Sequence, residues 1–250
     1  MTTLVSLRGV SKTFDSGLRA IGNLEFNVEQ GDFLSLVGPS GCGKSTVLRI
    51  IAGLLQPTSG AVTFAGPKPK MGFVFQEPTL MPWATALGNA RLALDLTLVA
   101  RHEAERRARE ALVRVGLGGF EGAYPRELSG GMKMRVSIAR AIAAQPKLIL
   151  MDEPFAALDE LTRQALNDDL LKLWREDALT VVFVTHSVFE SAYLSSRVAV
   201  MTPRPGQIAK EIALDAPVDR KAQFRLSPEF ALSAGKVSAA LTDAMQRASA

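Results

Sequence analysis

The sequence has few of the features that mark secreted or membrane-spanning chains. It contains one cysteine, Cys42, in 250 residues. A single cysteine cannot form an intrachain disulfide, which favours a reducing compartment. Residues 1–8 contain no apolar signal core, and apolar runs such as Leu148–Met151 and Val181–Val184 have the length of a strand, not of a membrane span. We therefore expect a chain that is soluble by itself and reaches a membrane only through a partner.

An excess of charge of one sign is also missing. The 29 Lys and Arg residues against 25 Asp and Glu residues give a net charge of +4, which does not indicate a nucleic-acid partner or strong attraction to anionic lipid. Hydrophobic residues make up 47% and charged residues 22%, as in an ordinary folded protein. The length suffices for one large α/β domain or a core with a smaller insert.

The chain does contain a glycine-rich loop that fits the pattern G-x-x-x-x-G-K-[ST]. The loop follows the apolar run Phe33–Val37. Glycines let the backbone fold around a phosphate with its N–H groups inward. Lys44 would place a charge near the β- and γ-phosphates, and Ser45 would offer a hydroxyl to Mg²⁺. The predicted nucleotide-binding residues are Gly38, Pro39, Ser40, Gly41, Cys42, Gly43, Lys44, Ser45 and Thr46.

Apolar patterning predicts an α/β chain with a helical insert. Strands are expected at Val5–Phe14, Gly22–Val28, Phe33–Val37, Ala61–Ala65, Met71–Phe75, Lys147–Met151, Thr180–Thr185, Arg197–Met201 and Gln207–Leu214. Helices are expected at Ser45–Leu54, at His102–Val115, from Ser129 to about Ala144, at Glu160–Glu176 and in the Ala-rich tail after Pro228, with turns at 57–60 and 203–206. The first two strands read as antiparallel, and a strand on each side of Glu160–Glu176 indicates a parallel sheet.

A second apolar strand ends in two acidic residues. Asp152 can hold Mg²⁺ directly or through water, and Glu153 can polarise an attacking water. The alternative is a solvent-exposed pair of acids at a strand end. The phosphate loop upstream favours the catalytic interpretation.

The order of these motifs resembles that of the ATP-binding cassette (ABC) superfamily. Residues 128–132, LSGGM, lie between the helical stretch and the acidic strand, and the family signature reads LSGGQ. The resemblance covers about residues 4–214. It implies an α/β P-loop (RecA-like) core with an antiparallel β subdomain and an inserted helical subdomain at about 79–127. It also implies a single domain over 1–250, with a C-terminal extension at 215–250.

The resemblance also implies roles for further residues. Gln76 matches the Q-loop glutamine that contacts Mg²⁺ and water, and His186 matches the switch histidine at the γ-phosphate. Phe14 matches the aromatic that stacks on adenine, with a core aromatic as the alternative. Asp159 matches the D-loop, and the resemblance implies that it contacts nucleotide together with Ser129, Gly130 and Gly131. The implied cofactors are ATP and Mg²⁺, with catalytic Glu153, His186 and Gln76 and with metal ligands Ser45, Gln76 and Asp152.

Three departures from the family pattern leave this chemistry intact. Met132 replaces the glutamine of the signature, Phe14 lacks the hydroxyl of the usual tyrosine, and Ala156 replaces a common serine. None of the three changes removes a phosphate ligand, a metal ligand or the water-activating group. We therefore expect ATPase activity.

The family works as a head-to-tail dimer that drives a membrane protein. The resemblance implies a homodimer at the cytoplasmic face of the inner membrane, with integral membrane permease subunits and, indirectly, a periplasmic solute-binding protein as partners. Residues 80–83 and 152–159 look like the importer group for nitrate, aliphatic sulfonates, taurine and bicarbonate. The expected function is ATP hydrolysis that energises import of a small solute. A soluble ABC ATPase not coupled to transport, an exporter subunit and a nucleotide-sensing regulator are the alternatives.

Overall fold

The computed structural model of the chain describes residues 2–217, 219–220 and 222–247. The predicted single domain over 1–250 and its extension at 215–250 therefore include some residues outside the described ones. The chain forms two compact units. Unit 1 consists of Met1–Lys68 and Ala178–Ala250, and unit 2 consists of Pro69–Asp177.

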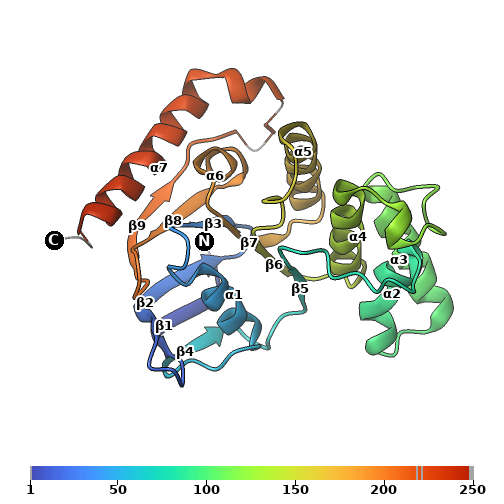
Figure 1. The fold of residues 1–250 in the computed structure, drawn as a ribbon, viewed down its shortest axis with the longest axis horizontal. Helices are drawn as coiled ribbons and strands as arrows, with labels where there is room; N and C mark the ends of the chain where they lie inside the picture. The colour runs from blue at the N-terminus through green and yellow to red at the C-terminus, as the bar shows by residue number, and fades with distance from the viewer. Residues whose placement is uncertain (1, 218, 221, 248–250) are drawn as a thin grey trace. The chain divides into compact units, whose positions relative to one another are not determined.

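Unit 1 contains two groups of strands (Figure 1). An antiparallel sheet has the order β2-β1-β4, with β1 at Thr3–Thr13, β2 at Arg19–Glu29 and β4 at Ser59–Phe64. The other group has the order β7-β3-β8-β9, formed by β7 at Thr180–Thr185, β3 at Phe33–Val37, β8 at Arg197–Met201 and β9 at Ile208–Ala213. Strand β3 is parallel to β7 and to β8, and all five residues of β3 are buried.

In the described part of unit 1, α-helices and a short 3-10 helix accompany these strands. They are α1 at Lys44–Ala52, α6 at Val188–Leu194, η2 at Ala222–Leu226 and α7 at Pro228–Arg247. Helix α7, drawn in red, runs beside β8 and β9 (Figure 1). Its residues Val237, Ala240 and Ala244 are buried with Val198, Val200 and Ile212 in one hydrophobic cluster. The expected helical tail is thus part of the core of unit 1.

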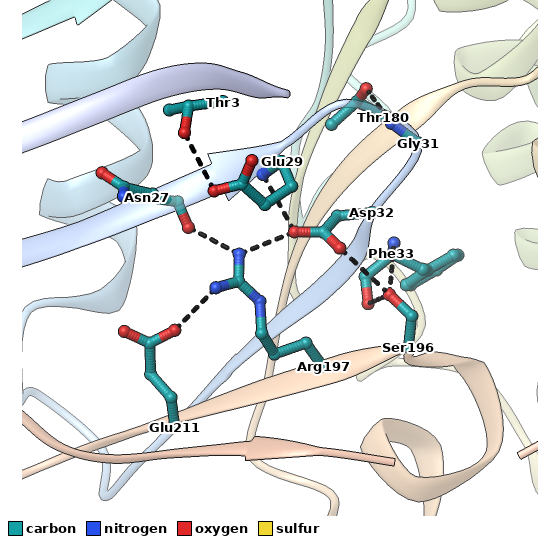
Figure 2. A network of polar contacts seen from close by, with 10 residues as sticks. All are labelled: Thr3, Asn27, Glu29, Gly31, Asp32, Phe33, Thr180, Ser196, Arg197 and Glu211. Carbon is teal, nitrogen blue, oxygen red and sulfur yellow. Dashed lines mark hydrogen bonds and ion pairs between the residues drawn. The ribbon is translucent and has the colours of Figure 1, made fainter. Parts of the chain in front are cut away.

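A polar network fixes the start of β3 (Figure 2). The Arg197 guanidinium donates to the Asp32 carboxylate at 2.6 Å, to the Asn27 carbonyl at 2.6 Å and to the Glu211 carboxylate at 2.8 Å. The Phe33 amide donates to the Ser196 hydroxyl at 3.0 Å. The network joins β2, β3, β8 and β9 at the N-terminal end of β3. It thereby helps to fix the position of the whole strand, including its C-terminal end at Val37.

Unit 2 contains one parallel strand pair and a group of helices. The strands are β5 at Met71–Val74 and β6 at Leu148–Asp152. The helices are α2 at Ala86–Leu96, α3 at Arg101–Arg114, η1 at Pro125–Glu127, α4 at Gly130–Ala143 and α5 at Glu160–Glu176. Helix α2 packs against α3 and α4, the green helices of Figure 1. Ala90 and Leu94 of α2 and Ala104 and Ala108 of α3 are buried.

Most predicted elements are present, but the structure differs from the prediction at several places. Helices α2 and α6 were not predicted as separate helices. Strand β1 ends at Thr13, so that Phe14 lies just outside it. The predicted turn at 57–60 is instead partly strand, because β4 begins at Ser59. Gly60 has φ 78° and approaches Gly9 so closely that a Cβ atom on Gly60 would lie 2.3 Å from the Gly9 carbonyl oxygen. Gly60 lies where the pairing of β1 with β4 is irregular. From the sequence alone it resembles a turn residue.

Candidate active site

The phosphate loop of unit 1 connects β3 to α1. Gly41 and Gly43 have φ angles of 76° and 106°, which are left-handed conformations that glycine adopts at little cost. A Cβ atom on Gly43 would lie 2.5 Å from the Ile21 side chain and 3.0 Å from the Ala20 carbonyl oxygen. Helix α1 has no acidic residue in its first turn, so the positive end of its dipole is free to favour an anion.

Lys44 lies within this loop. Its side chain is buried, and its Nζ atom donates to the carbonyl oxygens of Gly38 at 2.9 Å and Pro39 at 3.1 Å. Gly38 and Cys42 are buried, whereas Ser40 and Gly41 are exposed and Ser45 and Thr46 are half-buried. Of the nine predicted residues, 38–43 therefore form the loop, whose Gly38 and Pro39 carbonyls accept from the lysine ammonium group, and Lys44, Ser45 and Thr46 begin α1.

The predicted switch histidine belongs to the same edge of unit 1. Val37 of β3 pairs with Thr185 of β7, so the phosphate loop and His186 each follow a strand at the same level of the sheet. His186 is exposed. The Thr185 hydroxyl donates to the Glu190 carboxylate and accepts from the Ser187 amide at 3.0 Å. These bonds fix the backbone on both sides of the histidine.

Phe14 is at the surface of unit 1, just after β1. Its ring is 36% exposed, and the Lys12 ammonium lies 5.5 Å from the ring centroid. The Phe14 amide donates to the Leu18 carbonyl at 3.0 Å, which closes a short loop. An accessible ring on a closed loop excludes the alternative of a core aromatic for this residue.

An acidic edge forms in unit 2, where β5 and β6 end side by side. Val74 of β5 pairs with Met151 of β6, so Gln76 follows one strand, while Asp152 ends the other and Glu153 follows it. Asp152 is 6% exposed, Gln76 is exposed, and Glu153 has φ 45°. A left-handed backbone costs a residue with a Cβ atom about 1–3 kcal/mol, and such strain occurs often at functional sites.

The segment after Gln76 is held by Arg140 of helix α4. This guanidinium donates to the Pro78 carbonyl at 3.0 Å, to the Thr79 carbonyl at 2.9 Å and to the Thr79 hydroxyl at 2.9 Å. Burial lowers the pKa of Arg140. Thr79 has φ 46°. The arginine thus fixes a strained segment three residues beyond the predicted metal ligand Gln76, a role that no local sequence pattern indicates.

Asn89 of helix α2 holds the next part of the same segment. It is fully buried, and its side-chain oxygen accepts from the Met81 amide at 2.7 Å. Its side-chain nitrogen donates to the carbonyls of Met81, Ala84 and Thr85 at 3.1, 3.0 and 3.1 Å. Trp83, inside this segment, is 74% exposed. A large apolar side chain is therefore presented on a rigid loop.

The predicted signature and D-loop residues meet in unit 2. Ser129 caps helix α4 by accepting from the Met132 amide at 3.2 Å, as expected for an N-cap. A Cβ atom on Gly131 would lie 2.6 Å from Cγ2 of Thr162, so only glycine fits this approach of α4 to α5. Asp159 caps α5, and the hydrogen bond from the Thr162 amide holds the pKa of its carboxyl below the usual range. Ser129, Gly130 and Asp159 are exposed.

Comparison with known proteins assigns this set of motifs to a family. The family model described as "ABC transporter" matches residues 21–156, which include the phosphate loop, Gln76, the signature residues and the acidic pair. The match spans more than half of the chain. The chain therefore belongs to the ABC transporter family. It is an ATP-binding ATPase of the kind that is coupled to transport, and its fold is the α/β P-loop fold of the ABC cassette.

Similar proteins carry names of the same kind. The chain is 47% identical over 230 residues to the uncharacterized ABC transporter ATP-binding protein MJ0412 of Methanocaldococcus jannaschii, covering 88% of this chain and 86% of that protein. It is 44% identical over 224 residues to the aliphatic sulfonates import ATP-binding protein SsuB of Bacillus cereus, covering 86% and 88%. A dimeric structure of the ATP-binding cassette MJ0796 bound to ADP and Pi matches with a TM-score of 0.76 and 36% identity, covering 86% of this chain and all of that one.

ABC ATP-binding subunits dimerise and pair with membrane permeases. Among residues 2–217, 219–220 and 222–247, no helix has the length and apolar character that crossing a bilayer requires.

Proposed function

We propose that this chain energises an importer for a small solute of the nitrate, sulfonate, taurine or bicarbonate type. The observation that carries the proposal is the 44% identity to SsuB of Bacillus cereus over 224 residues, a protein named for aliphatic sulfonate import. The segment Leu80–Trp83 supports it, because a rigid loop with an exposed tryptophan suits the docking of a permease helix.

The donor set of this chain fits Mg²⁺. This ion prefers oxygen ligands and is bound in nucleotide sites by one or two protein groups together with phosphates. Asp152 offers a carboxylate at 6% exposure, Ser45 a hydroxyl and Gln76 an amide oxygen. When bound, the ion would neutralise charge on the β- and γ-phosphates. We assign Ser45, Gln76 and Asp152 as its ligands.

The remaining roles follow from the chemistry of each side chain. Residues 38–46 bind the phosphates through backbone amides and Lys44, and Phe14 stacks on adenine. Glu153 accepts a proton from water as the water oxygen attacks the γ-phosphorus and the bond to the ADP oxygen breaks. His186 donates a hydrogen bond to the γ-phosphate as charge builds up. The products are ADP and phosphate.

A second copy of the chain completes the proposal. In a head-to-tail homodimer, each copy contacts the nucleotide held by the other copy through Ser129, Gly130, Gly131 and Asp159. The N-terminus of α4 supports this role, because Ser129 uses its hydroxyl for Met132 and other first-turn amides stay available for an anion. ATP would then stabilise the dimer and hydrolysis would release it. The complex would associate peripherally with the membrane on its cytoplasmic face, with a periplasmic binding protein as the indirect partner.

Growth of the source organism tests the transport assignment. Deletion of the gene is expected to abolish growth on one of taurine, an alkane sulfonate or nitrate as the sole source of sulfur or nitrogen, and to leave growth on sulfate and ammonium unchanged. Wild-type protein should restore growth, and Glu153→Gln should not. Growth on every one of these solutes after deletion would count against the importer group.

The tryptophan tests the docking surface separately. Trp83→Ala is expected to keep the ATPase rate of the isolated subunit and to lose copurification with the permease. Leu161→Ala is a suitable control, because Leu161 is 80% exposed on α5 in the same unit. Copurification of Trp83→Ala at the wild-type level would exclude Trp83 as an anchor.

A further inference from the structure

The turn at 202–207, between β8 and β9, lies against the phosphate loop in unit 1. It closes on itself, since the Thr202 amide donates to the Gln207 carbonyl at 2.9 Å and the Gln207 amide donates to the Thr202 hydroxyl at 3.1 Å. Val37 of β3 pairs with Val200 of β8. The turn and the phosphate loop therefore leave neighbouring parallel strands at the same edge.

The turn is also attached to β2. The Gly206 amide donates to the Ala20 carbonyl at 3.0 Å, and the Gly22 amide donates to the Gly206 carbonyl at 2.9 Å. A Cβ atom on Gly206 would lie 2.1 Å from the Cys42 carbonyl oxygen. Glycine at this position thus lets the turn reach the loop backbone directly.

Arg204 makes the polar contact between the two segments. Its Nη2 and Nε atoms donate to the Gly41 carbonyl at 2.6 and 3.0 Å. The Gly41 carbonyl and the Cys42 N–H belong to one planar peptide group and point in opposite directions. The Cys42 N–H donates to the Pro39 carbonyl at 3.3 Å. The guanidinium therefore holds this peptide with its carbonyl toward the turn at 202–207 and its N–H toward Pro39.

We propose that Arg204 is a positioning residue that fixes the Gly41–Cys42 peptide of the phosphate loop in the orientation that binds phosphate. The need for such an anchor follows from the glycines, which leave the backbone more freedom to lose on folding than any other residue. The turn is anchored to β2, and the planar guanidinium supplies two donors that converge on the Gly41 carbonyl oxygen. This inference rests on the phosphate loop and not on the solute or the permease.

The only cysteine of the chain gives a direct readout. Cys42 is 1% exposed and follows Gly41, so its reaction with a thiol reagent in nucleotide-free protein reports on opening of the loop. We expect Arg204→Ala to raise the labelling rate about three- to tenfold, as for loss of hydrogen bonds at an exposed position. We expect the same variant to weaken binding of a fluorescent ATP analogue by a similar factor.

Two further variants make the test specific. Arg204→Lys should recover part of both effects, because an ammonium group can donate to the same carbonyl but lacks the paired geometry. Arg49→Ala, which removes an exposed arginine at the other end of α1, should change neither. Wild-type labelling in Arg204→Ala, or faster labelling with unchanged nucleotide affinity, would overturn the positioning role. Because labelling needs neither hydrolysis nor transport, its result is separate from that of the proposed function.

Discussion

The phosphate loop of unit 1 and the acidic edge of unit 2 both contain residues with positive φ, but the residue types differ. At the phosphate loop of unit 1, the residues with positive φ are glycines, Gly41 at 76° and Gly43 at 106°. At the acidic edge of unit 2, they are Glu153 at 45° and Thr79 at 46°. Glycine suits a place where backbone must approach a ligand or another strand. A strained residue with a side chain suits a place where that side chain is needed.

The largest expected effect concerns the side chain of Glu153. Glu153→Gln removes the proposed proton acceptor and keeps the shape and backbone, so hydrolysis should fall by about 10²–10⁴-fold, the usual contribution of a general base. ATP affinity should stay within a small factor of wild type. Phosphate release measured beside nucleotide binding checks both. Turnover near the wild-type rate would remove Glu153 from this role, and the backbone strain at position 153 would then serve no catalytic step.

The next effect concerns the glycines of unit 1. In Gly43→Ala the new Cβ atom would lie 2.5 Å from the Ile21 side chain at φ 106°, so the free energy of unfolding should fall by about 2–4 kcal/mol. Gly17→Ala is the matched control, since Gly17 has φ 79° and a Cβ atom added there would have no atom of the described residues within 4 Å apart from its chain neighbours. It should lose only about 1 kcal/mol. Equal losses in urea unfolding would mean that the close approach to β2 has no effect of its own.

The phosphate loop, strand β3 and helix α5 could be predicted from the sequence, because each one depends on residues that are neighbours in the chain. The structure places β3 and α5 at the predicted bounds. The strand ends then bring Gln76 beside Asp152 within unit 2, and His186 beside the phosphate loop within unit 1, by parallel pairing.

The residues that hold the loops could not be predicted in this way. Arg140 reaches Thr79 across 61 positions, and Arg204 reaches Gly41 across 163. Both arginines donate to backbone carbonyls. Because every residue carries such a carbonyl, the sequence does not indicate which residue accepts the hydrogen bond. Asn89 appears as one more polar residue of a helix until its burial is known.

The side-chain anchors of unit 2 should be costly to remove. Asn89→Ala would leave the Met81 amide and several carbonyls without their buried partner, so we expect a loss of about 2–3 kcal/mol in the free energy of unfolding. Asn167→Ala is the control, because Asn167 is also buried in unit 2 but its side-chain oxygen has no hydrogen-bond partner among the residues that the structure describes. It should lose clearly less. A similar loss in both variants would mean that burial, and not the anchoring of residues 81–85, sets the cost.

The smallest expected effect is a difference in free energy of unfolding between two variants at position 153. This difference separates the contribution of the Glu153 backbone from that of its side chain. Glu153→Gly and Glu153→Ala both remove the carboxylate with all its contacts, and they differ only in the Cβ atom at φ 45°. A left-handed residue favours glycine by about 1 kcal/mol, partly offset by the greater freedom of glycine in the unfolded chain. We therefore expect the glycine variant to be more stable than the alanine variant by about 0.5–1 kcal/mol in urea unfolding with equal m-values. Neither variant should hydrolyse ATP at the wild-type rate. An alanine variant as stable as the glycine variant would show that the backbone at position 153 is not strained. The left-handed conformation of Glu153 would then not lower the free energy of unfolding.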